Sequence, residues 1–217
     1  MTDNPMGPGR PGEPWLTWVK TLRSIAQSGL TYAESPFDRD RYTKILSLAA
    51  EIAAAETDGD FDRIHDLFAT AQGYETPKVD VRGVVFQDDQ ILLVRELLDG
   101  GRWTLPGGWA DVNDRPSEAV EREVWEESGY RVRAAKLLAV YDRRLHGHRP
   151  PHPNGIYKLF FLCELLGGAP ATSMETTGAS FFAEDAIPPL SLARVTREEI
   201  VRLFQHHRNP ELPADFD

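Results

Sequence analysis

Three glutamates stand close together in the middle of the chain, within the stretch REVWEESGY at residues 122–130. Glu123, Glu126 and Glu127 are spaced i, i+3 and i+4, and a helix that turns about 100° per residue places all three on one face. Two carboxylates about 4 Å apart repel by roughly 1 kcal/mol even in water. Because Mg²⁺ prefers carboxylate oxygens, water and substrate phosphates, the spacing predicts a divalent-metal site for diphosphate chemistry. Mg²⁺ is the expected cofactor, with Mn²⁺ as a substitute.

The residues on either side suit the same site. The Gly107-Gly108 pair lets the backbone approach a metal or ligand closely, because glycine has no Cβ, and Gly107 is the expected backbone ligand. Pro116 favours the first turn of a helix and Gly129 its end, so we expect a helix between them. Within it Arg122 can clamp neighbouring carboxylates through fork-shaped hydrogen bonds. Its predicted role is orientation rather than proton transfer.

The segment from Gly108 to Tyr130 resembles the Nudix box, which reads Gly, five residues, Glu, seven residues, Arg-Glu-aliphatic-any-Glu-Glu-any-Gly-aliphatic. Two positions depart from it, since Asp114 stands where Glu is usual and Tyr130 where an aliphatic residue is usual. Asp114 keeps the charge with a shorter reach, and Tyr130 is expected to affect packing only. The positions that match in register are Gly108, Arg122, Glu123, Val124, Glu126, Glu127 and Gly129.

The Nudix resemblance implies a catalytic scheme. Metal ions held by Glu123, Glu126, Glu127 and Gly107 lie across a pyrophosphate and activate water. The family takes its general base either from a box glutamate or from a downstream acid. Glu123 and Glu175 are therefore the two candidates, and an ordinary surface acid is the alternative for Glu175.

Positive charge for a phosphate substrate is concentrated in the loop 143–152, which reads RRLHGHRPPH. Its three histidines alternate with Gly, Arg and Pro, and no thiol lies near them, so the pattern does not favour zinc. We expect a mobile loop that covers the substrate, and a simple solvated connection is the alternative. For Arg82, Arg95 and Lys158, which lie outside this loop, an ordinary surface ion pair is the alternative. The candidate substrate-binding residues are Arg82, Arg95, Arg143, Arg144, His146 and Lys158.

Composition limits the classes of function. The 217 residues, 41% of them hydrophobic, suffice for one ordinary core and a smaller second one. A formal net charge of −10 argues against non-specific binding to nucleic acid and against an anionic membrane surface. The single cysteine, Cys163, lies in an apolar run and predicts a reduced thiol in the core. The first residues lack the apolar segment of a signal peptide, and no apolar run is long enough to span a membrane, so we expect a cytoplasmic enzyme.

The chain divides into two parts by its hydrophobic periodicity. Residues 1–14 are rich in Pro and Gly and predict a disordered arm. Helical spacing over 15–29, ended by Gly29, and over 41–56 and 60–72 predicts a helical N-terminal domain over 15–73. A linker over 74–78, a catalytic domain over 79–208 and a tail over 209–217 complete the expected organisation.

Strand patterns begin at about residue 79. Residues 79–86 and 91–94 flank Asp88-Asp89 and predict a hairpin. Further strands are expected at 132–143, 156–166 and 179–183, and a last helix at 196–208. The prediction is an α+β protein, in which the Nudix resemblance implies an α/β/α sandwich with a mixed sheet.

The helical unit followed by residues 73–83 resembles the Nudix branch typified by CDP-choline pyrophosphatase and the UDP-X diphosphatases. Residues 140–143, 157–161 and 181–190 are similar too. The branch implies homodimers in which the helical unit forms part of the interface. It also implies hydrolysis of a nucleoside diphosphate linked to a group X, giving NMP and phospho-X. Two alternatives stay open: pyrophosphohydrolysis of ADP-ribose, dinucleotides or an RNA end, and a non-catalytic nucleotide sensor.

Overall fold

The computed structural model describes residues 14–57, 59–152 and 154–217. The chain divides into two compact units between Thr76 and Pro77. The predicted disordered arm lies outside the described residues except for Pro14, which begins the first helix. Within the described part of the chain, no helix has both the length and the apolar character needed to cross a membrane.

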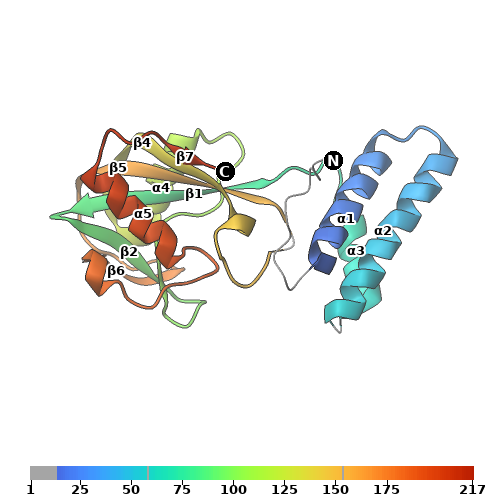
Figure 1. Cartoon of the computed structure of the whole chain (residues 1–217), viewed down its shortest axis with the longest axis horizontal. Helices are drawn as coiled ribbons and strands as arrows, with labels where there is room; N and C mark the ends of the chain where they lie inside the picture. Colours follow the sequence, from blue (N-terminus) through green and yellow to red (C-terminus); the bar gives the residue numbers. More distant parts are fainter. Residues whose placement is uncertain (1–13, 58, 153) are drawn as a thin grey trace, which may run out of the picture. The chain divides into compact units, whose positions relative to one another are not determined.

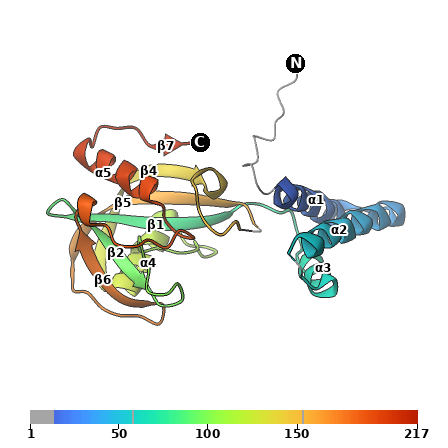
Figure 2. The ribbon, with the colours of Figure 1, turned by 60° about the horizontal axis from the view of Figure 1, so that its bottom comes forward.

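The first unit contains three helices, α1 (Pro14–Tyr32), α2 (Pro36–Thr57) and α3 (Phe61–Ala69), visible in Figures 1 and 2. Gly29 does not end the first helix as predicted, because α1 continues to Tyr32. A Cβ at Gly29 would lie 2.4 Å from the ring of Tyr42, so this glycine lets α1 and α2 approach closely. The buried core of the unit consists of Val19, Ala26, Leu46, Ala49, Ala50, Ala53 and Phe68.

The second unit is built on a mixed sheet. Its strands run in the order β3-β2-β1-β5-β4-β7, and β6 pairs with the β2 strand. The pairs β1–β5 and β4–β7 are parallel, and the other pairs are antiparallel. The bounds are β1 (Lys78–Gln87), β2 (Gln90–Glu96), β3 (Trp103–Thr104), β4 (Tyr130–Asp142), β5 (Ile156–Gly168), β6 (Thr176–Phe182) and β7 (Asp215–Phe216).

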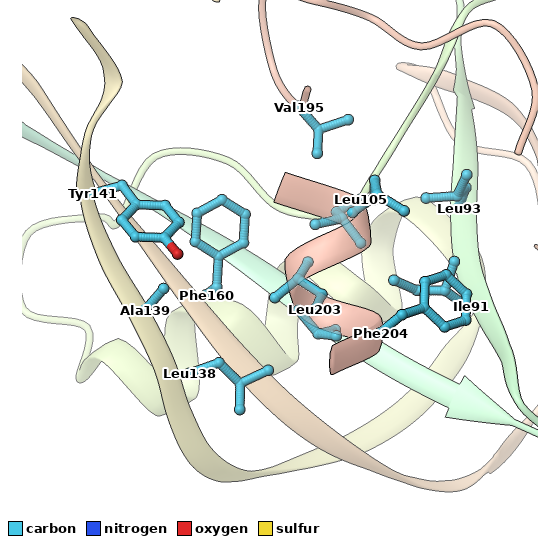
Figure 3. Close-up of a cluster of buried hydrophobic side chains, with 12 residues drawn as sticks. Ile91, Leu93, Leu105, Leu138, Ala139, Tyr141, Phe160, Val195, Leu203 and Phe204 are labelled. Carbon is cyan, nitrogen blue, oxygen red and sulfur yellow. The ribbon is translucent and has the colours of Figure 1, made fainter. Parts of the chain in front are cut away.

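Two helices cover the two faces of this sheet. Alternate residues of a strand point to opposite faces, and the α4 helix (Pro116–Ser128) packs on the face that carries Val81 and Val85. The α5 helix (Arg197–Arg208) packs on the other face, where Leu203 and Phe204 join Phe160 (Figure 3). The predicted α/β/α sandwich and helical N-terminal unit are therefore confirmed.

The β1–β2 hairpin has the predicted turn. Asp88 and Asp89 adopt φ of 49° and 57°, and two successive residues with positive φ form the turn whose twist matches paired strands. Two short 3₁₀ helices, η1 (Arg143–Leu145) and η2 (Glu184–Ala186), lie in the connections. The sequence carries no sign of the two-residue strands β3 and β7.

Candidate active site

The acidic helix α4 lies tightly against strand β1. A Cβ at Gly83 would lie 2.3 Å from Cγ2 of Val124, so glycine at this position lets the helix approach the strand. Pro116 begins the helix, and Gly129 ends it with φ of 76°, a left-handed conformation that glycine adopts without strain. The observed bounds of α4 are those predicted, and they fix which glutamates share a face.

The glycine-containing loop runs along the same strand. The carbonyls of Pro106 and Gly108 accept hydrogen bonds from Gly83 and Val81, each at 2.8 Å. Gly107 between them has φ of 143°, and a Cβ there would lie 2.1 Å from the carbonyl oxygen of Val81. Among the described residues, no hydrogen bond reaches the carbonyl oxygen of Gly107. That oxygen is available to a ligand.

Glu127 is the most buried carboxylate of the helix. Its side-chain Oε2 accepts a hydrogen bond from the amide of Gly107 at 2.8 Å, and the residue is 6% exposed. Burial raises the pKa of Glu127 to about 8, against the opposing charge of Arg82. Burial also raises the pKa of Glu123, against the charge of Arg122. The two carboxylates therefore stand where negative charge is costly, and a cation would relieve that cost.

Arg122 joins the carboxylates on the exposed side of α4. Its Nη1 donates to Oε1 of Glu123 at 2.9 Å and to Oε2 of Glu126 at 3.1 Å, and its Nη2 donates to Oδ2 of Asp114 at 3.2 Å. Aspartate is thus long enough at position 114 to reach the guanidinium. Glu126 is half exposed and is held by Arg122. It is not among the residues that line the pocket described next.

A pocket of about 450 Å³ opens beside Glu123 and Glu127. Its wall carries five carboxyl groups and three guanidiniums, so acidic groups outnumber basic ones. When all five are ionised, they repel a diphosphate unless a cation enters with it. The charged residues of the wall are Asp80, Asp111, Glu123, Glu127 and Glu175, with Arg82, Arg143 and Arg194.

Three of the other predicted site residues lie in this wall. The Arg82 guanidinium donates to Asp80 at 2.8 Å and to the carbonyl of Leu105 at 3.1 Å, and it is buried. Arg143 is also buried, and its Nη2 donates to the carbonyl of Pro150 at 2.8 Å. Glu175, the downstream candidate base, is exposed at the pocket wall.

Four predicted substrate contacts lie elsewhere. Lys158 is 1% exposed, and its Nζ is hydrogen-bonded to Oδ2 of Asp80. It therefore does not line the pocket itself, and it acts on the pocket through Asp80, which also pairs with Arg82. Arg95 donates to the carbonyl of Gly101 at 3.1 Å. Outside the pocket wall, Arg144 pairs with Asp142, and His146 contacts Asp217 at 2.8 Å while stacking on Tyr141.

The loop 143–152 is anchored at several points along its length. His148 is buried, and its Nε2 lies 2.9 Å from Oε1 of Glu199 while its Nδ1 lies 3.2 Å from the carbonyl of Leu192. The amide of Arg149 donates to the same carbonyl at 2.9 Å. Where the sequence predicted a mobile cover, the structure shows a loop tied to the 191–199 segment, because its basic and imidazole groups bond to the protein.

Four charged residues at the site were not predicted: Asp80, Asp111 and Arg194 in the pocket wall, and Glu96 beside Arg194. Asp80 and Arg82 are two apart on strand β1 and so share a face, a pattern that could have indicated their pairing. Burial alone would raise the pKa of Asp80, but the charges of Arg82 and Lys158 outweigh it, so the pKa lies below its usual value. Glu96 and Arg194 form an ion pair of 2.8 Å across 98 positions of sequence, and no local pattern predicts it.

The donor set at the pocket fits a hard divalent cation. Carboxylate oxygens of Glu123 and Glu127 and the carbonyl of Gly107 are the oxygen ligands that Mg²⁺ prefers. Among the described residues, no three His, Cys, Asp or Glu side chains are grouped as a complete metal site. Arg122 pairs with oxygens of both Glu123 and Glu126. A cation would have to compete with this guanidinium for them.

Comparison with known proteins identifies the family. The NUDIX domain matches residues 76–204, and the domain described as UDP-X-like, N-terminal oligomerisation domain matches residues 13–68. The chain belongs to the Nudix family and is a Nudix pyrophosphohydrolase.

Two relatives match nearly the whole chain, and a third matches about two thirds of it. A putative ADP-ribose pyrophosphatase of Bacillus subtilis is 43% identical over 94% of this chain and 97% of its own length. The crystal structure of a UDP-X diphosphatase is 32% identical, covers 94% of this chain and 98% of its own, and has a TM-score of 0.61. That of an ADP-ribose pyrophosphatase from Streptococcus suis is 39% identical, covers 65% of this chain and 100% of its own, and has a TM-score of 0.60.

Proposed function

We propose that this enzyme hydrolyses the pyrophosphate of a nucleoside diphosphate linked to a group X, such as CDP-choline or a UDP- or CDP-sugar, and releases NMP and phospho-X. The observation that carries the proposal is the wall of the pocket, where the box glutamates Glu123 and Glu127 face the same space as three arginines. Carboxylates suit a cation, and guanidiniums suit the oxygens of a diphosphate.

Mg²⁺ is the proposed cofactor, with Mn²⁺ as a substitute, held by Glu123, Glu126, Glu127 and the carbonyl of Gly107. When bound, the ion neutralises charge on the phosphate oxygens and lowers the pKa of bound water. The excess of five carboxylates over three guanidiniums in the wall supports this dependence. Arg122 orients Glu123 and Glu126 through its hydrogen bonds to both carboxylates.

The remaining residues position the substrate and move the proton. Arg82 is fixed by Asp80 and by the carbonyl of Leu105, so its positive charge stays in place without reorganisation during turnover. Glu175 lies at the exposed part of the wall, where it would accept a proton from the attacking water. Glu123 is the second candidate base, and burial raises the pKa of its carboxyl above the usual value.

ADP-ribose is a second candidate substrate. Two relatives at 43% and 39% identity are described as ADP-ribose pyrophosphatases, one of them putative. ADP-ribose is also a nucleoside diphosphate joined to a sugar, so the same charged wall would accept it. The two proposals differ only in the base and in X.

A homodimer is the proposed assembly. The match of residues 13–68 to a domain described as an oligomerisation domain supports it. The α1 helix offers a suitable surface, because Trp18, Ile25 and Tyr32 follow at intervals of seven residues and each is at least half exposed. Residues seven apart lie on nearly the same face of a helix.

The test is a substrate panel in Mg²⁺ with purified protein. It comprises CDP-choline, CDP-, UDP- and ADP-sugars, ADP-ribose, dinucleotides and a short 5′-triphosphate RNA, with products resolved by chromatography. We expect NMP from one group, and a loss of at least about 100-fold in kcat for Glu127→Gln. Glutamine keeps the size of the side chain and its hydrogen bond from Gly107, so the fold should persist.

Glu118→Gln is the matched control, since Glu118 lies on the same helix and is exposed outside the pocket wall. Its turnover should equal that of the wild type. Undiminished turnover in both Glu126→Gln and Glu127→Gln would overturn the proposed metal site. Saturable nucleotide binding with no product from any compound would instead support the sensor alternative.

A further inference from the structure

Arg194 is the most accessible cation in the wall of the pocket. Its backbone amide closes a turn by donating to the carbonyl of Ser191 at 2.9 Å. Its side chain is 31% exposed and lines the pocket together with Glu123 and Glu127. Within the described part of the chain, Glu96 is its ion-pair partner, with Nε 2.8 Å from Oε1.

The other two arginines of the wall already donate most of their hydrogen bonds to the protein. Arg82 is buried, and its Nε, Nη1 and Nη2 all donate to Asp80 or to the carbonyl of Leu105. Arg143 is buried too, with Nε and Nη2 donating to the carbonyls of Ala193 and Pro150. They supply positive charge to the pocket, but each keeps fewer unused N–H donors than Arg194.

Glu96 holds Arg194 in a fixed position. It is the last residue of β2, its side chain is buried, and its carboxylate lies beside the Arg194 guanidinium. A guanidinium has five N–H donors, and one carboxylate engages at most two of them in a fork. Donors therefore remain on Arg194 for a second anion. A partner already fixed in place loses less side-chain entropy when that anion binds.

We propose that Arg194 is a substrate-binding residue that donates hydrogen bonds to the diphosphate, and that Glu96 is the positioning residue that orients it. The inference rests on the proposed function and extends it to residues outside the Nudix box. Diphosphate oxygens match the planar fork of arginine, whereas the single ammonium of lysine does not reproduce it. The chemistry thus predicts a graded response to substitution at position 194.

The experiment compares Arg194→Gln, Arg194→Lys and Glu96→Gln with the wild type. Binding of methylenediphosphonate, a diphosphate that cannot be hydrolysed, is measured by calorimetry at fixed Mg²⁺ concentration. KM and kcat are measured on the compound that the wild type hydrolyses. Arg194→Gln should raise both Kd and KM by about 10- to 100-fold with a smaller change in kcat. Arg194→Lys should recover part of this loss, and Glu96→Gln should raise Kd by roughly 3- to 10-fold.

Arg102→Gln is the charge-matched control, because Arg102 pairs with Asp99 at the surface and does not line the pocket. Kd and KM equal to those of this control in folded Arg194→Gln would overturn the inference while leaving the proposed function intact. If Arg194→Gln does not fold, the same comparison with Arg194→Lys decides. A wild type that neither binds the diphosphonate nor hydrolyses any compound of the panel would refute the proposed function itself.

Discussion

Asp80 is the residue on which the buried positive charges near the pocket depend. It is hydrogen-bonded to both Arg82 and Lys158, and all three side chains are buried. Removing one partner of a buried ion pair leaves an uncompensated charge and costs about 3–5 kcal/mol. Asp80→Asn should therefore lower the free energy of unfolding by about that amount, measured by urea denaturation.

Lys158→Met provides the comparison, because it removes one buried cation and leaves the pair of Asp80 and Arg82 in place. Methionine fills a similar volume without charge, so its loss of stability should be clearly smaller. Equal losses in the two variants would contradict the view that Asp80 is the shared counter-ion.

Among the residues of the site, the sequence predicted the positions of the acidic side chains better than those of the basic side chains. The glutamates lie within five residues of one another on a helix, so their spacing alone placed them together. The arginines reach the pocket from separate strands and loops, and only the three-dimensional fold decides which of them arrive. Arg95 and Glu96 are neighbours on one strand, yet only Glu96 joins the network at the pocket.

Strand β7 is an element that the sequence does not reveal, and the carboxylate of Asp215 adds side-chain bonds to its backbone pairing with β4. Asp215 accepts hydrogen bonds from Arg202 at 2.5 and 2.6 Å, from His206 at 2.9 Å and from Tyr141 at 3.0 Å. The hydrogen bonds from Arg202 above all hold the pKa of Asp215 well below its usual value. They therefore link the strand to helix α5 and to β4.

The sign of the resulting pH dependence follows from this lowered pKa. The stability that Asp215 contributes is fully present above its unfolded pKa of about 3.8 and is lost as the pH falls towards the folded value. Asp215→Asn should thus cost roughly 1–2 kcal/mol at pH 7, since Arg202 is about one third exposed. Its stability should also fall less steeply than that of the wild type below about pH 5.

Thermal unfolding between pH 3 and pH 7 measures both effects. Glu211→Gln, at an exposed position of the same segment, is the control and should follow the wild type. An acid dependence in Asp215→Asn as steep as in the wild type would show that other carboxylates produce it.

Elements with a clear period were predictable, and those without one were not. Helix α4, the β1–β2 hairpin and helix α5 carry apolar residues at helical or strand spacing with caps or turns at their ends. A two-residue strand has no period, so β3 and β7 left no signal. Gly29 shows the opposite error, because a glycine needed for close packing of two helices looks in the sequence like a helix stop.

At the scale of the whole molecule, each unit has its own buried core. The helical unit packs seven buried residues, among them Leu46 and Phe68, whereas the catalytic unit has a separate cluster on each face of its sheet. The helical unit also exposes a stripe of three large apolar side chains along α1. Burying such a stripe is favourable by roughly 25 cal/mol for each Å² removed from water.

We expect the wild type to be a dimer by light scattering after size exclusion, and Ile25→Glu to shift it towards the monomer. Glutamate in the centre of the stripe would place two charges in an apolar interface, which is costly. Because Ile25 is half exposed in the single chain, the helical unit should remain folded, as circular dichroism would show. Leu67→Glu is the matched control, since Leu67 is an exposed apolar residue on α3 and should leave the mass unchanged. A monomeric wild type, or a dimer that Ile25→Glu does not weaken at any concentration, would mean that α1 does not form the interface.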